Sequence, residues 1–258
     1  MDRTTKRALP LVRLTALLLL ALQIFAVDIA FAETSAGEAD QAFTEAQAAY
    51  DRKDYDTAFT KWRELAEAGN AQAQYHVGYM IFRAEGTNYD IREARQGRER
   101  AAKGGVELAQ VELADMLANR QGGQHDAPLA VFWYEAAVKQ GNVKAMRELA
   151  GLYSGKPGVP ENQKRATALY KAAAERGDAK AQSMLGLRYG LGEGIRRDEY
   201  KGYLWQTISA LTTAKTDPEE AEAKLVIRDY IPWTLSKRQK LAAEREAKKW
   251  VEKNAAKQ

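Results

Sequence analysis

Cysteine is absent from this sequence of 258 residues, and histidine and proline are scarce, with two and six residues. Without cysteine the chain can form no disulfide and has no lipid attachment site of the bacterial lipoprotein kind. Packing alone must therefore stabilise the fold, even in an oxidising compartment. The low proline content and the 45% of apolar residues are ordinary for a soluble, helix-rich protein.

The sequence also lacks a strong excess of either charge. The formal net charge is +4, and the first 32 residues supply +2 of it, which leaves +2 for the rest of the chain. Lys and Arg are interleaved with Glu and Asp almost everywhere before the last predicted helix. Nucleic-acid binding normally requires a concentrated basic stripe. We therefore expect no nucleic-acid partner.

The apolar run Leu14–Val27 is shorter than the roughly 20 residues that cross a bilayer. It follows a basic segment, residues 1–13, and precedes the small-x-small pattern that ends at Ala32. This order is typical of a secretory signal peptide, so we predict cleavage after Ala32 and a periplasmic or secreted protein. The alternative is a retained membrane anchor, which is the one case in which we expect a membrane partner.

The chain is dominated by an internal repeat. Four copies align without gaps at a shift of 36 residues, each anchored on a glycine: Gly69, Gly105, Gly141 and Gly177. Four and nine positions later stand small residues: Ala73, Ala109, Ala145, Ala181, and Gly78, Ala114, Ala150, Gly186. A second glycine and an Asp or Asn follow at positions 17 and 21: Gly86, Gly122, Gly158, Gly194, and Asp90, Asp126, Asn162, Asp198. Eleven and seven positions before each anchor stand an alanine and a large residue: Ala58, Ala94, Ala130, Ala166, and Trp62, Arg98, Tyr134, Tyr170.

These offsets predict two helices per repeat. Small and apolar residues recur at intervals of three and four from about two to fourteen positions after each anchor, as one buried helix face requires; we name this helix A. The second glycine breaks the chain, and the Asp or Asn caps helix B, which runs to the next anchor glycine. Asp90 and Glu93 have the spacing of a capping box. Because the small positions let paired helices approach closely, we predict an all-α solenoid of stacked helix-turn-helix repeats.

The repeats are flanked by segments that we interpret as caps. The predicted order is a signal peptide at 1–32, an N-terminal capping helix at 33–54, four repeats at 55–214 and C-terminal capping helices at 215–258. The N-terminal cap is a lone helix A, Glu38–Tyr50, with Ala42 at the small position and Asp54 capping the next helix.

The C-terminal cap is predicted to contain two helices after the last helix B, Tyr200–Thr213. One starts at Asp217 and is interrupted at Pro232, and the other starts at Ser236. The last helix is basic. We interpret its charge as a solvated face, and contact with an anionic polymer or membrane surface is the alternative.

Three stretches of sequence carry a family resemblance. They are Ala-Gln-Tyr-His-Val-Gly-Tyr at 73–79, Phe-Trp-Tyr-Glu-Ala-Ala-Val-Lys-Gln-Gly-Asn at 132–142, and Ala-Gln-Ser-Met-Leu-Gly-Leu-Arg-Tyr-Gly-Leu-Gly-Glu-Gly-Ile at 181–195. Over residues 55–213 the chain resembles the Sel-one-like repeat (SLR), a relative of the tetratricopeptide repeat (TPR). The resemblance implies a right-handed α/α superhelix with a concave face. The second repeat departs from the pattern at Arg98 and at 118–121, so we expect a looser unit there.

The sequence contains no convincing catalytic or metal-binding pattern. His76 and His125 are 49 positions apart, and without Cys or His-Glu-x-x-His a zinc site would need carboxylates from separate repeats. We interpret His76 as structural. The glycines at 190, 192 and 194 follow no predicted strand, which indicates turn residues rather than a phosphate loop. With no Gly-x-Ser-x-Gly elbow either, we expect neither enzyme activity nor a cofactor nor a metal.

The resemblance also implies where a partner binds, because TPR ligands lie along the concave face, on helix A residues beside the small positions. The matching positions here are Gln72, Tyr75, Tyr79, Phe82, Arg83, Asp115, Asn119, Lys144, Arg147, Ser154, Lys180, Ser183 and Leu187. Aromatic residues followed by the cations Lys144, Arg147 and Lys180 suit an extended peptide with an apolar anchor and acidic residues. The alternative is that the aromatic residues of this set pack against the N-terminal capping helix.

Members of the family in bacterial envelopes act as adaptors, including periplasmic regulators of sensor kinases and scaffolds for polysaccharide secretion. The resemblance therefore implies a non-catalytic periplasmic scaffold that binds a protein or peptide partner of the envelope. One alternative is a cell-wall or exopolysaccharide-associated module that binds polysaccharide or peptidoglycan. The other is a β-lactamase-like hydrolase, an activity assigned to cysteine-rich members of the family, from which this cysteine-free chain departs.

Overall fold

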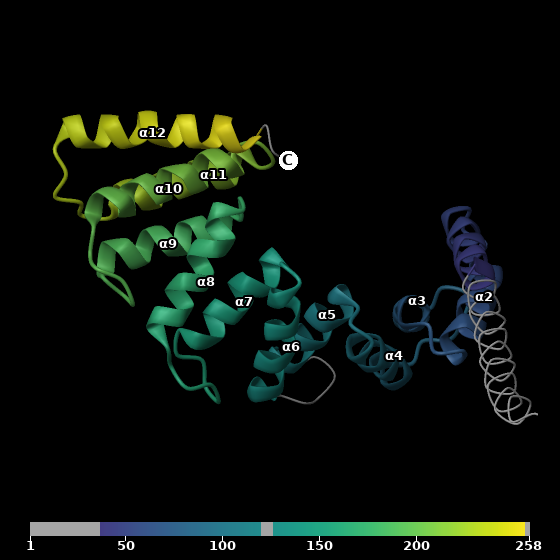
Figure 1. Ribbon diagram of the computed structural model, residues 1–258. Coiled ribbons are helices and arrows are strands. Elements are labelled where there is room, and N and C mark those ends of the chain that lie inside the picture. Colours follow the sequence, from purple (N-terminus) through teal and green to yellow (C-terminus); the bar gives the residue numbers. More distant parts are fainter. Residues whose placement is uncertain (1–36, 120–125, 256–258) are drawn as a thin grey trace, which may run out of the picture. The chain divides into compact units, whose positions relative to one another are not determined.

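The computed structural model describes residues 37–119 and 126–255 of the chain. The predicted signal peptide and His125 therefore lie outside the described residues. Within them every regular element is a helix (Figure 1). A helical stretch at 37–51 is followed by α2 (Tyr55–Glu67), α3 (Ala71–Arg83), α4 (Ile91–Lys103), α5 (Glu107–Ala118), α6 (Ala127–Lys139), α7 (Val143–Tyr153), α8 (Gln163–Glu175), α9 (Ala179–Leu191), α10 (Glu199–Thr213), α11 (Pro218–Tyr230) and α12 (Lys237–Ala255).

The helices begin and end where the repeat predicts. The carboxylate or amide oxygens of the residues predicted to cap helix B accept backbone N–H groups of the first turn at Asp54, Asp90, Asp126, Asn162 and Asp198. The anchor glycines all have φ between 88° and 96°, the left-handed conformation that ends a helix. One of the two hydrogen bonds of the predicted capping box forms, because the Asp90 carboxylate accepts the backbone N–H of Glu93. The Glu93 carboxylate instead lies 3.6 Å from the Arg63 guanidinium.

The second glycine of the repeat is required by close packing as well as by its turn. Gly86 and Gly194 both have φ of 66°. A Cβ atom at either position would collide with the carbonyl oxygen of the first residue of the preceding helix B, Tyr55 or Gln163. The two glycines lie at the same distance in the sequence from the residues they contact. The repeat therefore specifies the close contact between this glycine and the start of the preceding helix B.

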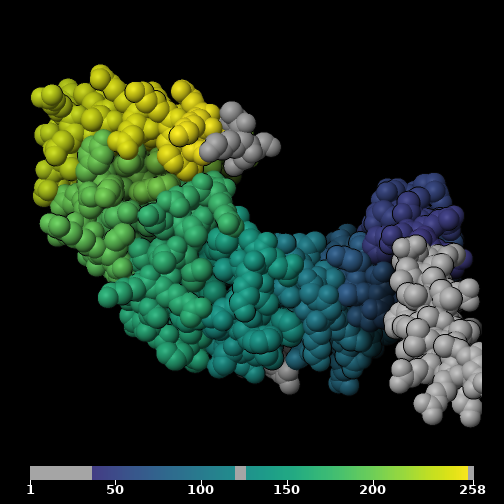
Figure 2. Space-filling model, viewed as in Figure 1, coloured from purple at the N-terminus to yellow at the C-terminus, as the bar shows by residue number. Residues whose placement is uncertain are grey.

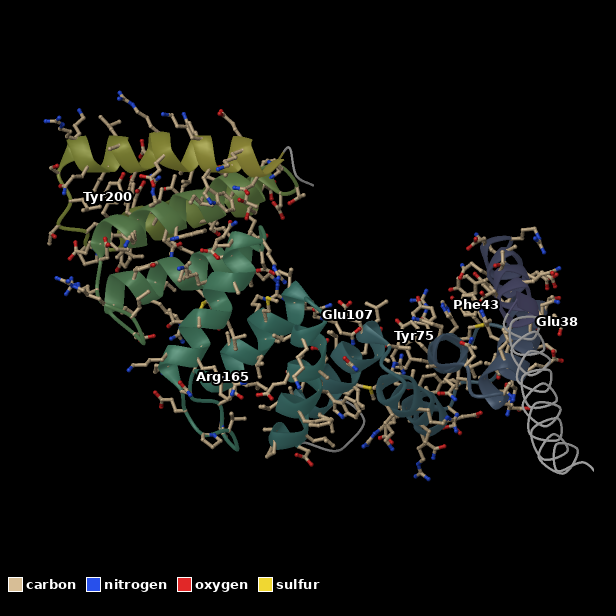
Figure 3. The ribbon with its side chains drawn as sticks, viewed as in Figure 1. Glu38, Phe43, Tyr75, Glu107, Arg165 and Tyr200 are labelled. Carbon is tan, nitrogen blue, oxygen red and sulfur yellow. The ribbon has the colours of Figure 1, made fainter. Side chains whose placement is uncertain are left out.

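The chain divides into two compact units, residues 1–94 and 95–258, which are described separately. In the first unit the helical stretch 37–51, α2 and α3 enclose a core centred on Trp62, which is fully buried. The imidazole of His76 stacks on the Trp62 indole with 4.2 Å between ring centroids. Phe43, labelled in Figure 3, approaches His76 edge-on at 5.5 Å. His76 is thus a packing residue, as the sequence predicts.

The prediction that Ala42 occupies the small packing position of the capping helix is wrong. Ala42 is half-buried, whereas Ala46 and Ala49 are 0% and 1% exposed. The reason is the connection to α2. The helix continues to residue 51, and only two residues separate it from the capping residue Asp54. The loop is shorter than in the repeats, so the buried position moves one helical turn toward the C-terminus.

In the second unit the A helices α5, α7 and α9 alternate with the B helices α6, α8 and α10. The predicted small positions are fully buried, as at Ala109, Ala145 and Ala181. The departure at Arg98 is accommodated in the core. Arg98 stands where an aromatic ring is usual and is 5% exposed, and its guanidinium donates to Glu112 over 2.7 Å.

The C-terminal end is closed by α11 and α12, which pack on α10 (Figure 2). The indole of Trp233 fills the space above two glycines, because a Cβ atom at Gly190 or Gly202 would lie 3.0 or 2.7 Å from its ring. The Trp233 Nε1–H donates to the carbonyl of Arg228 over 2.7 Å. Ser236 and Gln239 form the capping box that starts α12. Between α10 and α12 the hydroxyl of Tyr200, labelled in Figure 3, donates to Glu246 over 2.8 Å.

Among the helices of the described residues, none combines the length and the apolar character that a bilayer span requires.

Candidate binding site

The predicted partner-binding residues fall on A helices in both units, and each group is considered within its own unit. In the first unit they lie on α3. Gln72 and Arg83 are exposed, Tyr79 is half-buried, and Phe82 is 42% exposed. Tyr75 is only 8% exposed, so its ring belongs mainly to the core.

The aromatic residues of α3 are linked to the capping helix through Tyr50. The Tyr50 hydroxyl donates to Glu85 over 2.8 Å, and the Arg83 guanidinium lies 3.4 Å from the other oxygen of that carboxylate. Burial, the Glu85 carboxylate and the nearby Tyr79 together raise the pKa of Tyr50. Tyr79 therefore lies close to the capping helix. Phe82 instead lies beside Tyr89, with 6.2 Å between ring centroids.

In the second unit the predicted residues bridge successive A helices by ion pairs. Lys144 of α7 donates to Asp115 of α5 over 2.6 Å, and the same carboxylate accepts the hydroxyl of Tyr134 over 2.5 Å. Burial and the Asp115 carboxylate raise the pKa of Tyr134, which keeps its hydroxyl protonated. Asp115 thus fixes α5, α6 and α7 around one carboxylate.

The next bridge joins α7 to α9. Arg147 forms ion pairs with Asp178, the N-cap of α9, and with Glu148. Burial opposes the charge on the guanidinium, but the Glu148 and Asp178 carboxylates outweigh it and raise the pKa of Arg147. Two of the three predicted cations, Lys144 and Arg147, are therefore already neutralised within the unit. Lys180 is exposed, and no ion pair of the described residues includes it.

The remaining predicted residues have different surroundings. Asn119 is exposed, just beyond the end of α5. Ser183 faces α10, where its hydroxyl donates to Gln206 over 3.1 Å. The Ser154 hydroxyl accepts from the buried guanidinium of Arg188 over 2.5 Å. Leu187 lines a small apolar pocket of about 190 Å³ beside Trp233. Only some of the predicted partner-binding residues are thus available to a partner.

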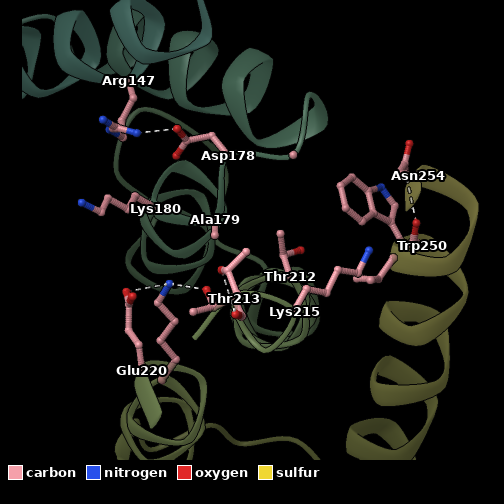
Figure 4. Close-up of a pocket in the computed structure, with 14 residues that line it drawn as sticks. Arg147, Asp178, Ala179, Lys180, Thr212, Thr213, Lys215, Glu220, Trp250 and Asn254 are labelled. Carbon is pink, nitrogen blue, oxygen red and sulfur yellow. Dashed lines mark hydrogen bonds and ion pairs between the residues drawn. The ribbon is translucent and has the colours of Figure 1, made fainter. Parts of the chain in front are cut away.

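A larger pocket, of about 360 Å³, lies where the A helices meet the C-terminal cap. Figure 4 shows that it combines two predicted residues, Arg147 and Lys180, with side chains from α10, α11, α12 and the α10–α11 connection. The sequence alone does not assign the other lining residues to a binding site. The repeat could have indicated Asp178, because it follows an anchor glycine at the position where Asn70 and Asn142 also cap A helices. The others lie mainly outside the repeat.

The described residues show no arrangement suited to metal binding. None of their His, Asp and Glu side chains gather in a group of three or more that could hold an ion. His76 is held between aromatic rings, and its burial lowers its pKa. In the second unit Asp115 is held in an ion pair with Lys144, and Asp178 caps α9 and pairs with Arg147.

Comparisons with known proteins agree with the helical repeat. The Sel1 repeat model matches residues 71–105, 108–142, 143–178 and 179–208, together more than half of the chain. A Sel1 repeat protein from Oxalobacter formigenes is 26% identical, with a TM-score of 0.63 over 82% of this chain and 87% of that chain. The protective antigen c5321 of uropathogenic Escherichia coli, which has an SLR fold, is 20% identical, with a TM-score of 0.52. That alignment covers 87% of this chain and 55% of the antigen, and it shows the fold alone.

No protein of curated function matches the chain in sequence. The four matched segments pair α3 with α4, α5 with α6, α7 with α8, and α9 with most of α10. Each pair has the helix-turn-helix form that the offsets predict. The chain therefore belongs to the Sel1 repeat family.

Proposed function

We propose that the protein is a non-catalytic scaffold of the bacterial cell envelope that binds an extended segment of a partner protein along its A helices. Sel1 repeats are generally protein–protein interaction modules. Export rests on the predicted signal peptide at residues 1–32.

The row of A helices in the second unit is the observation that carries the proposal. The ion pairs Lys144–Asp115 and Arg147–Asp178 hold three successive A helices in register. A surface fixed in this way needs little reordering when it binds, which lowers the entropic cost of association. Polar groups along the row suit the backbone and charged side chains of an extended segment.

Site-specific photocrosslinking tests the proposal. A benzophenone amino acid is placed on the A helix side at Asn119 or at Leu108, which is 56% exposed and has the same offset from its anchor glycine as Lys144. It is also placed at Lys139 or Lys164 on the exposed surface of the B helices α6 and α8. Irradiation of living cells is expected to give a discrete protein adduct from the A helix positions and none from the B helix positions. Adducts of equal strength from both sets, or from neither, would contradict binding along the A helices.

The compartment is measured in the same cells. We expect the protein in the fraction released by osmotic shock, with Glu33 as its first residue. A chain that stays with the cytoplasmic fraction and keeps its first 32 residues would contradict export.

A further inference from the structure

The 360 Å³ pocket at the C-terminal cap has an excess of positive charge. Four basic side chains and two carboxylates line it: Arg147, Lys180, Lys215, Lys224, Asp178 and Glu220. Arg147 is paired with Asp178, and Lys224 lies 3.2 Å from Glu220. No ion pair of the described residues includes the two other lysines, Lys180 and Lys215. The pocket thus has two positive charges that its own carboxylates do not offset.

The neutral lining adds hydrogen-bonding groups and a ring. The hydroxyl oxygen of Thr212 is buried and has no hydrogen-bond partner among the described residues. Figure 4 shows Lys215 extending from the α10–α11 connection toward Trp250, which forms one wall with Asn254. The Arg147–Asp178 pair lies on the other side of the opening.

We propose that this pocket binds the carboxylate of an acidic side chain on an extended partner peptide. The inference rests on the proposed function, because the pocket shares Arg147 and Lys180 with the A helix row along which that peptide runs. The two lysines that form no ion pair give the pocket a positive charge that a carboxylate complements, and hydrogen bonds to a charged group are stronger than neutral ones. A volume near the lower end for ligand sites suits a side chain better than a long polymer.

Binding of designed peptides to the purified chain tests the pocket. The probes are two fluorescein-labelled octapeptide pools with random flanks, one with Asp or Glu at the centre and one with Asn or Gln there. We expect the acidic pool to bind at least about tenfold more tightly, and the preference to shrink as salt is raised. In the double variant Lys180→Gln and Lys215→Gln the preference is expected to disappear.

Matched controls separate a local charge effect from a general one. Lys139→Gln with Lys164→Gln removes the same charge from exposed B helix positions and is expected to keep the preference. Thr212→Val removes a buried hydroxyl without changing charge and is also expected to keep the preference. Circular dichroism of each variant confirms that the helices are intact.

The outcomes distinguish the pocket from the proposed function. Equal affinity for the two pools, or a preference that survives in the pocket variant, overturns the carboxylate site while leaving crosslinking along the A helices as it stands. Oligogalacturonate that binds more tightly than the acidic pool, and through the same two lysines, overturns a peptide as the occupant. If Asn119 and Leu108 also give no protein adduct, the proposed function fails with the pocket.

Discussion

The two ends of the molecule are closed by different means. At the N-terminal end a single helix covers the first repeat, and rings do most of the packing: Trp62 is surrounded by Phe43, Tyr50 and His76. At the C-terminal end two helices cover the last repeat, and a buried guanidinium lies at their junction. Arg228 is 8% exposed, stacks over the ring of Tyr203 and reaches groups of α10 and α12.

This difference shows that the repeat determines the interior of the stack but not its ends. A terminal repeat has an apolar face with no neighbour, and a capping segment must cover it. One helix suffices when large rings supply buried area. Two more polar helices need directional contacts that fix their orientation. Substitutions of rings and of charges should therefore affect the two ends unequally.

Replacing Trp62 by Ala is expected to have the largest effect. The indole is fully buried and contacts three other rings, so its removal leaves a cavity in the core of the first unit. Substitutions of this kind lower the free energy of unfolding by roughly 3–5 kcal/mol. Urea unfolding followed by circular dichroism measures the change. Tyr230→Ala is the control, because Tyr230 is 89% exposed and should shift stability by no more than about 0.5 kcal/mol.

Arg228→Leu is the corresponding change at the other end. It removes the hydrogen bond to Thr207, the paired contacts with Asp229 and the stacking on Tyr203, 4.6 Å from the ring centre. We expect a loss of about 2 kcal/mol. Arg63→Leu is the matched control, since Arg63 is 49% exposed and its ion pairs should contribute less than about 0.5 kcal/mol. Equal losses in the two variants would show that burial of Arg228 adds nothing.

Gly202→Ala should disturb the C-terminal end by crowding. The new methyl group would lie 2.7 Å from the Trp233 ring and 3.1 Å from the Gly186 carbonyl oxygen, so the cap must shift. Such overpacking costs roughly 1–3 kcal/mol. The double variant with Trp233→Leu tests the cause, because removing the indole should make the added methyl group less costly. Strictly additive effects of the two substitutions would contradict a clash between them.

These positions also show how far the sequence predicts the structure. The four-fold offsets predict the helices, their caps and their buried alanines, because each repeat presents the same local chemistry. They do not predict that Gly190 and Gly202 together admit Trp233, since the three residues are brought together only by the fold. The buried small position of the capping helix shifts from Ala42 to Ala46 because the loop before α2 is short. The Lys215 and Trp250 side of the pocket lies in the C-terminal cap, where no repeat guides prediction.

The smallest predicted effect concerns pH and again separates the two ends. Burial among the aromatic rings lowers the pKa of His76 below the value of about 6.5 that a solvated imidazole has. In the unfolded chain the imidazole titrates near 6.5, so between the two pKa values the unfolded state binds more protons. The free energy of unfolding therefore falls as the pH drops below 6.5, by at most about 1.4 kcal/mol per pH unit. Above pH 6.5 His76 contributes no pH dependence.

The sequence offers a direct measurement, because it contains only two histidines. Their imidazole proton resonances are followed by NMR as the pH is lowered, alongside urea unfolding at each pH. His76→Gln should remove the slope between pH 6.5 and 5, while His125→Gln should keep it. An unchanged slope in the first variant would assign the pH dependence to other groups. A slope that disappears would assign the pH dependence to His76 in the aromatic core of the N-terminal end.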